Sequence, residues 1–407
     1  SDISKHVTPI LQSVAELDCD DEDVLAPIVS GTRTLLLDEA YLALAPNDEA
    51  IASMLRFLLG KGRGLVIHSV DVIINLLGDY FRSQTVETRN KKPLGTVCLA
   101  IQLALCHGVR IDQLSEAVSG FLRCGDLDDI LAECTISDLS YLVFMASTMG
   151  WTDEDVLLFM ARRVLNESHV ESCHHSEACR ILSCFTNIAE QIQNEELNSL
   201  IPDIFHSYGV HLLTVRLSPE EISSSLSAYA RAPYVLDMGI FDHLASLLST
   251  MLPSCSCSDV AKSIWACAKM FTLESDKEHE PPYLAYVRAC LPKVADVIHD
   301  MSPKEISQMI WAIATFRDHV VDDKVQHMVR SLTQRFVDPN LEEPLAEDAA
   351  TILRALATLQ VNDAAIFEAL SNIVKEQLGT AKDRTIEDVV WAYKKASFKL
   401  PRELTNQ

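Results

Sequence analysis

Histidine and cysteine side chains gather in one short stretch of the chain, where they have the chemistry to bind a metal ion. The stretch contains His169, Cys173, His174, His175, Cys179 and Cys184. Zinc modules hold such ligands at defined spacings, and the spacing here matches none of them. Cys179 and Cys184 diverge on a helix because five residues separate them. We therefore predict a polar loop followed by core cysteines, with no metal and no other cofactor.

Catalytic motifs offer no alternative chemistry. The sequence contains no G-x-S-x-G, no G-x-x-x-x-G-K-[ST], no G-x-G-x-x-G and no H-E-x-x-H. Paired acids such as Glu220-Glu221 are typical of helix starts, where they interact favourably with the positive end of the helix dipole. We predict that the protein is not an enzyme.

A short phrase recurs along the C-terminal half of the chain. Residues 263–269 read SIWACAK, and the phrase returns as MIWAIAT at 309–315 and as VWAY at 390–393. Fainter copies are SLSAYA at 225–230 and ILRALA at 352–357. Self-similarity at a spacing of a few tens of residues indicates a solenoid built from repeats.

Trp265 marks the equivalent place in each copy, which we call the anchor position. The anchor positions are Gln102, Phe144, Ser183, Ser227, Trp265, Trp311, Arg354 and Trp391. Their spacing predicts an all-α protein, an α-solenoid of about eight helical-hairpin repeats of roughly 37–46 residues. We assign residues 91–407 to this array. Residues 1–90 fit the spacing poorly and are predicted to form a divergent helical N-terminal cap.

Each repeat is predicted to contain two helices. Ser218 and Ser302 are each followed by proline and, three residues after the serine, by glutamate, a pattern that caps a helix start. The phrase then lies in this first helix. An apolar stripe at intervals of four, three and four residues marks the second helix. Its members are Leu197, Ile201, Ile204, Tyr208; Ile240, Leu244, Leu247, Met251; Val287, Leu291, Val294, Ile298; Val325, Val329, Leu332 and Phe336.

Three of the four tryptophans, Trp265, Trp311 and Trp391, occupy anchor positions. Their recurrence beside small residues favours packing between layers of the array. Stacking on nucleotide bases remains the alternative, if the rings face a groove.

Composition bounds the environment of the protein. No run of eighteen apolar residues is present, so we expect no membrane span. The twelve cysteines fall mostly in helical segments, where they behave as small apolar residues, and this favours a reducing compartment. Because residue 1 is Ser rather than an initiator methionine, we expect a processed or trimmed N-terminus.

Charge constrains the partners most strongly. The net charge of -24 repels phosphate over much of the surface and favours basic proteins. Residues 380–407 differ, with six basic and four acidic side chains. We expect any contact with RNA, or with another partner that prefers basic residues, at Lys394, Lys395, Lys399 and Arg402 near this end.

Residues 301–316, MSPKEISQMIWAIATF, resemble the repeat helix of organellar helical-repeat proteins of apicomplexans, dinoflagellates and green algae. These include the heptatricopeptide and octotricopeptide repeat proteins and relatives with FAST-kinase-like and RAP domains. The resemblance is good over residues 217–400 and faint over 93–216. It implies a mitochondrial or plastid location and work in RNA metabolism or in the organellar ribosome. The octotricopeptide P-P-P-E-W signature and a RAP domain are absent from the sequence.

Together these observations predict a scaffold or adaptor subunit of a ribonucleoprotein assembly in the mitochondrial matrix, with the mitochondrial ribosome as the first candidate. Its partners would be other subunits of a large complex, bound through basic segments, and ribosomal RNA. Two alternatives stay open: an organellar RNA-binding factor acting in RNA stability or processing, and an accessory subunit of a respiratory-chain complex. A plastid location is the alternative to the mitochondrion.

Overall fold

The computed structural model describes residues 22–36, 93–106, 134–232, 237–273, 280–338 and 344–401, together with Leu341 and scattered positions between 51 and 77. Every regular element in this part of the chain is a helix, so the prediction of an all-α protein is confirmed. Helices pack on their neighbours along the chain, which gives the protein an α-solenoid-like character. Within the described residues, none of the helices combines the length and apolar character needed to cross a membrane.

Each anchor position lies in a helix of one series, which we call the first helices. They are α6 (Pro93–Cys106), α9 (Ile136–Met149), α12 (His175–Gln191), α14 (Pro219–Arg231), α16 (Cys257–Leu273), α18 (Pro303–Thr315), α21 (Ala346–Thr358) and α23 (Asp383–Lys395). The second helices alternate with them from α9 onward. They are α10 (Glu154–Val164), α13 (Glu195–Leu213), α15 (Met238–Thr250), α17 (Tyr283–Val297), α20 (Asp323–Phe336) and α22 (Ala364–Glu376).

A few shorter helices are inserted between these. They are α11 (Glu167–Ser172), η1 (Leu252–Ser254), η2 (Ile298–Asp300) and α19 (Arg317–Val320). Before α6, the structure describes α2 (Glu22–Leu36). The predicted boundary between a cap at 1–90 and an array at 91–407 adjoins residues 78–92, which lie outside the described residues, so this boundary stays a prediction.

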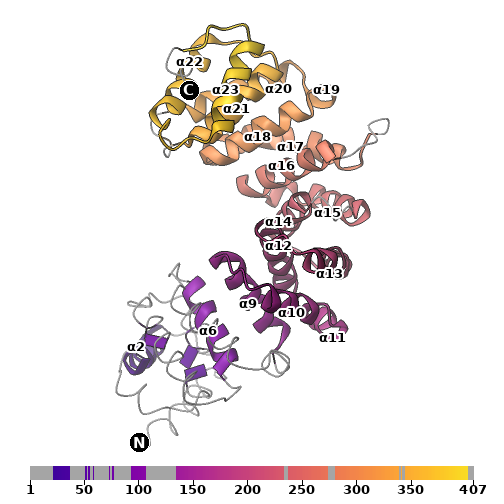
Figure 1. Ribbon diagram of the computed structural model, residues 1–407, viewed down its shortest axis with the longest axis vertical. Coiled ribbons are helices and arrows are strands. Elements are labelled where there is room, and N and C mark those ends of the chain that lie inside the picture. The colour runs from indigo at the N-terminus through magenta and orange to yellow at the C-terminus, as the bar shows by residue number, and fades with distance from the viewer. Residues whose placement is uncertain are drawn as a thin grey trace, which may run out of the picture. The chain divides into compact units, whose positions relative to one another are not determined.

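The chain divides into two compact units, unit 1 (Ser1–Tyr208) and unit 2 (Gly209–Gln407). In unit 1, α9 packs against α6, α10 and α12. In unit 2 the first helices pack in chain order, α14 on α16, α16 on α18, α18 on α21 and α21 on α23 (Figure 1). The second helices α15, α17, α20 and α22 pack on the first helices that precede them.

The predicted caps form as the sequence indicates. Ser218 Oγ accepts from the Glu221 amide at 3.3 Å, and the Glu221 carboxylate accepts from the Ser218 amide at 2.8 Å. Ser302 and Glu305 repeat this arrangement at the start of α18. Because two free amides are satisfied at each helix start, these capping boxes fix where α14 and α18 begin.

The apolar stripes of the second helices lie largely in the core. Thirteen of the sixteen stripe residues are buried, whereas Leu247, Met251 and Leu291 stay partly exposed. Buried tyrosines add polar ties between helices. Tyr286 of α17 hydrogen-bonds to Ser263 of α16 at 2.5 Å, and burial raises the pKa of this tyrosine, so its hydroxyl stays protonated.

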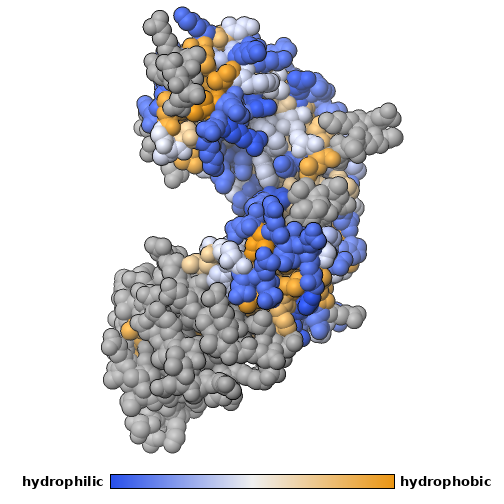
Figure 2. All heavy atoms as spheres, in the orientation of Figure 1, coloured by the Kyte–Doolittle hydropathy of each residue, from blue (hydrophilic) through white to orange (hydrophobic). Residues whose placement is uncertain are grey.

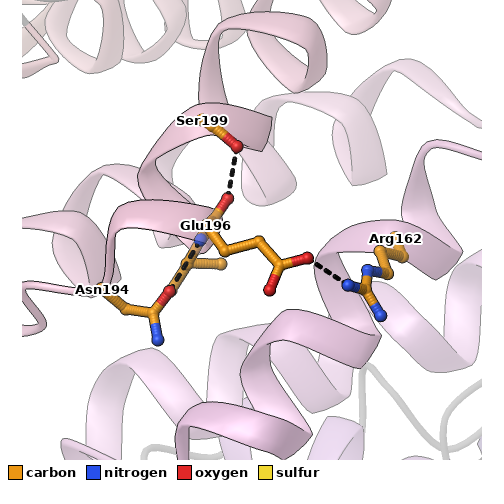
Figure 3. Close-up of polar contacts among 5 residues, drawn as sticks. Arg162, Asn194, Glu196 and Ser199 are labelled. Atoms are coloured by element: carbon orange, nitrogen blue, oxygen red, sulfur yellow. Dashed lines mark hydrogen bonds and ion pairs between the residues drawn. The ribbon is translucent and has the colours of Figure 1, made fainter.

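Charged side chains also join successive layers in unit 1 (Figure 3). Arg162 of α10 forms an ion pair with Glu196 of α13. Asn194 caps α13 by accepting from the Leu197 amide at 2.9 Å, and its side-chain amide donates to Glu154 of α10 at 2.6 Å. The start of one second helix is therefore held against the preceding one.

Candidate functional site

The anchor position lies at the edge of the core in unit 2, so its tryptophans are partly covered and not fully buried as the prediction of packing between layers implied. Trp265 and Trp311 are only half-buried, and Trp391 is 38% exposed. Ile310 and Ala312, on either side of Trp311, have no exposed surface. The inward face of the repeated phrase is thus its Ile and Ala side, and the tryptophan lies at the boundary with solvent.

The residues three before and four after each anchor share its outward face, because these spacings keep side chains on one side of a helix. We call this set in unit 2 the first-helix stripe. It comprises Ser224, Ser227 and Arg231 of α14; Lys262, Trp265 and Lys269 of α16; Gln308, Trp311 and Thr315 of α18; Thr351, Arg354 and Thr358 of α21; and Asp388, Trp391 and Lys395 of α23. Every one of these side chains is half-buried or exposed.

The stripe is basic although the protein is acidic. Its charged members are Arg231, Lys262, Lys269, Arg354 and Lys395, against the single acid Asp388. On a chain of net charge -24, this gives a positive band with aromatic rings between the cations. Cations and exposed rings at regular spacing are the combination that holds single-stranded nucleic acid.

Contacts between α21 and α23 show that the stripe residues of adjacent layers meet. The guanidinium carbon of Arg354 lies 4.8 Å from the centre of the Trp391 ring, and Arg354 also pairs with Asp388. A cation over the face of an indole ring is attracted to it, so the arginine holds the Trp391 ring in place.

Of the four residues predicted to contact a partner, the structure describes three, which lie at and just beyond the C-terminal end of α23. Lys394 and Lys395 are exposed in the last turn of α23, and Lys399 is exposed just beyond it. Arg402 falls outside the described residues. Val390 is also exposed here, and Figure 2 shows hydrophobic side chains gathered over α22 and α23. Contact of the four basic residues with a partner stays a prediction.

Sequence reasoning missed Lys262, Lys269 and Arg354 as site residues. The signal was nevertheless present in the sequence. Arg354 occupies an anchor position, and Lys262 and Lys269 lie three residues before and four residues after the anchor Trp265. Helical geometry alone assigns these positions to one face, but the sequence does not say whether that face is covered.

The histidine and cysteine cluster is used for capping and packing. His174 caps α12, and its Nδ1 lies 2.8 Å from Ser176 Oγ. Cys173, Cys179 and Cys184 are buried, and burial raises the pKa of Cys173 and of Cys184 to about 12, so both thiols stay protonated. In the part of the chain that the structure describes, no three His, Cys, Asp or Glu side chains are placed to share a metal ion.

No model of a known protein family matches the chain, and no curated protein matches it.

Proposed function

We propose that the chain is a non-enzymatic scaffold of about eight helical-hairpin repeats, and that it holds single-stranded RNA along the first-helix stripe within a mitochondrial ribonucleoprotein assembly. The mitochondrial ribosome is the first candidate for this assembly. The observation that carries the proposal is one shared register of the first helices, at which α16, α18 and α23 have a partly exposed tryptophan and α14, α16, α21 and α23 have a cation.

The repeat period is supported by hydrogen bonds between successive layers. Three of them in unit 1 join residues 40 positions apart: Arg180 to Ser140, Asn187 to Ser147 and Asn194 to Glu154. A period of this length agrees with the roughly 37–46 residues of the predicted repeat. Stacked repeats of this kind present one helix face per layer, which suits an extended ligand.

The stripe matches the chemistry of single-stranded RNA. Stacking of a base on an aromatic side chain contributes about 1–3 kcal/mol, and it tolerates any base because every base has a π face. Neighbouring helices pack about 8–10 Å apart, so Trp265 and Trp311 would contact different nucleotides. The cations beside them neutralise phosphates, while the acidic remainder of the surface repels RNA and restricts it to the stripe.

Basic protein partners would account for the excess of acidic residues outside the stripe. Residues 1–208 carry 31 acidic and 14 basic side chains, whereas residues 209–407 carry 27 and 20. The N-terminal half is therefore suited to basic protein segments, and a ribonucleoprotein supplies both these and RNA. The mitochondrial location rests on the resemblance of residues 301–316 to organellar repeat proteins.

An organellar RNA-binding factor acting in RNA stability or processing is the second candidate, and the same stripe favours it. Sedimentation of organelle extracts separates the two. A scaffold of the ribosome should migrate with ribosomal subunits and stay with their proteins after mild nuclease treatment. A factor bound only to RNA should be released.

RNA binding is tested directly with the full chain and a fluorescent twelve-nucleotide oligouridine, by anisotropy at about 0.1 M salt. Trp311→Ala should weaken binding about tenfold, because it removes one stacking partner and 1.4 kcal/mol corresponds to tenfold. The matched control is Trp151→Ala, since Trp151 follows α9 outside the stripe. Failure of the unaltered chain to bind, or equal weakening by both substitutions, would contradict the proposal.

A further inference from the structure

One face of each first helix in unit 2 points towards the next first helix along the chain. It consists of the positions four before, one before and three after the anchor, which lie on one side of a helix. Ser223 of α14, four before its anchor, donates to the carboxylate of Asp259 in α16 at 3.0 Å. Ser307 of α18, at the same position, donates to the backbone carbonyl of Asp348 in α21 at 3.4 Å. We call these three positions the stacking face.

The stacking face is buried in every layer of unit 2 that has another first helix after it. None of its side chains in α14, α16, α18 and α21 is more than 6% exposed. They are Ser223, Leu226 and Ala230; Ala261, Ile264 and Ala268; Ser307, Ile310 and Ala314; and Ala350, Leu353 and Ala357. All of them are small or apolar, which lets successive first helices approach closely.

The stacking face is open in α23, the last first helix that the structure describes (Figure 1). Its three residues are Glu387, Val390 and Lys394, and all three are exposed. The chain beyond α23 folds onto α22 instead, where Phe398 packs edge-on against Phe367. Within the described residues, the stacking face of α23 therefore has no covering helix.

Trp391 adds a second apolar side chain to this open face. It is 38% exposed, and the guanidinium of Arg354 occupies one side of its ring, so a partner meets the other side. No ion pair among the described residues engages Glu387 or Lys394. The open face thus presents an acid, a valine, a tryptophan and a base at positions i, i+3, i+4 and i+7, which share one side of a helix.

This order of side chains is complementary to itself when it is reversed. If α23 of a second copy lies antiparallel, Glu387 of each copy faces Lys394 of the other, and Val390 faces Trp391. A two-fold axis therefore forms two ion pairs and two apolar contacts at once. A parallel pair would oppose like charges at both ends of the contact, and this is unfavourable.

The distribution of charge along the chain favours a contact at the same place. Two copies with a net charge of -24 repel one another over most of their surface. Residues 380–407 carry six basic and four acidic side chains. Copies that meet through α23 keep their acidic remainders at a distance, where salt screens the repulsion within about 10 Å.

We propose that α23 is a homodimer contact, at which two copies of the chain pack antiparallel through Glu387, Val390, Trp391 and Lys394. The proposal goes beyond RNA binding and does not depend on it, although Trp391 belongs to both surfaces. Because a few turns of one helix per copy bury less area than a permanent dimer does, the association should be weak and reversible.

Sedimentation of the full chain without RNA tests the proposal. At about 0.15 M salt, the weight-average mass should rise from the 45.2 kDa of one chain towards twice that value as the concentration increases from about 1 to about 100 µM. The rise should stop at two copies, because a two-fold contact uses the same face on both chains and leaves none free.

Charge exchange locates the contact and fixes its direction. Glu387→Lys and Lys394→Glu should each weaken association about tenfold or more, because each substitution opposes like charges twice across the two-fold axis. An equimolar mixture of the two variants should associate again, since each presents the charges that complement the other. A chain with both substitutions should also dimerise, for the same reason.

Glu376→Lys is the matched control, because it makes the same change of charge at an exposed position of α22, outside the open face. It should alter the association constant less than twofold. All variants should unfold at the temperature of the unaltered chain, so that a loss of association is not a loss of folding.

Four results would overturn the proposal. These are a mass that stays at one chain throughout the concentration range, a mass that rises beyond two copies, equal weakening by Glu387→Lys and Glu376→Lys, and failure of the mixed variants to associate. A chain that stays single and loses oligouridine binding on Lys394→Glu would assign the open face of α23 to RNA.

Discussion

The same repeat register is used differently in the two units of the chain. In unit 1, the outward residues of α12 are joined to α9: Arg180 lies 4.1 Å from the centre of the Tyr141 ring and donates to Ser140 at 2.8 Å, and Asn187 donates to Ser147 at 3.0 Å. In unit 2, Lys262 and Lys269 flank Trp265 in α16 at the corresponding positions, and no ion pair engages either lysine among the described residues. This register therefore joins α12 to α9 in unit 1, whereas the two lysines of α16 are left without an ion pair, and we propose that they contact a partner.

The largest expected effect comes from comparing a buried and a partly exposed residue of the same repeated phrase, residues 309–315. Ile310→Ala should destabilise the protein by about 2–5 kcal/mol, because Ile310 is fully buried and its truncation leaves a cavity. Trp311→Ala should cost less, roughly 1–2 kcal/mol, since only the half-buried part of the ring packs against the protein. Urea unfolding of both variants measures the difference. Equal destabilisation by the two substitutions would show that Trp311 packs as a core residue.

A second test exchanges the roles of the two units. Arg180→Gln should lower the free energy of unfolding by about 1–2 kcal/mol, because it removes a cation–π contact and a hydrogen bond, and it should leave oligouridine affinity unchanged. Lys262→Gln should instead leave the free energy of unfolding unchanged and reduce the affinity for oligouridine. The comparison fails if either substitution affects both properties alike.

The salt dependence of RNA binding distinguishes the middle of the stripe from its end. Removal of one cation that neutralises a phosphate should flatten the log–log slope by about 0.7 for a single strand. The pair Lys262→Gln and Lys269→Gln should therefore reduce the slope by about 1.4 units. Replacement of Lys394, Lys395, Lys399 and Arg402 by Gln should reduce it further. If only the C-terminal set changes the slope, RNA binds the end of the array and the stripe is not its path.

The smallest expected effect concerns basic protein partners. A labelled oligolysine peptide should bind the chain weakly and dissociate as salt rises, because exposed charge pairs are screened over about 10 Å at 0.1 M. Carboxyl-to-amine crosslinking followed by mass spectrometry should place more of the contacts in residues 1–208, where acids outnumber bases most strongly. Crosslinks spread evenly over both halves would remove this distinction between the units.

Local chemistry made much of the fold predictable. The serine, proline and glutamate at Ser218 and Ser302 fix helix starts because a capping box is completed within four residues. The stripe of α20, from Val325 to Phe336, is buried as its spacing predicts, since it follows from the period of a helix. Lys395 was predicted as a partner residue from the charge at the end of the chain, and the structure places it in the first-helix stripe.

Burial of the anchor tryptophans was not predictable in this way. A large apolar ring beside small residues is equally compatible with a core position and with the rim of a helix face. The outcome depends on whether a helix from another layer covers that face, and this is a long-range property of packing. Leu291 illustrates the same error, because its stripe predicts burial while the structure leaves it partly exposed in a hollow between α17 and α20.

The sequence by itself determined that this protein is helical, where several of its helices begin and which residues share a helix face, because capping and periodicity act over a few neighbouring residues. The tertiary structure decided which faces remain exposed. It left Trp265, Trp311 and Trp391 only partly buried, joined Arg180 to α9, and left a hollow between α17 and α20. Exposure is set by contacts between residues tens of positions apart, and these depend on how each helix packs against the next layer.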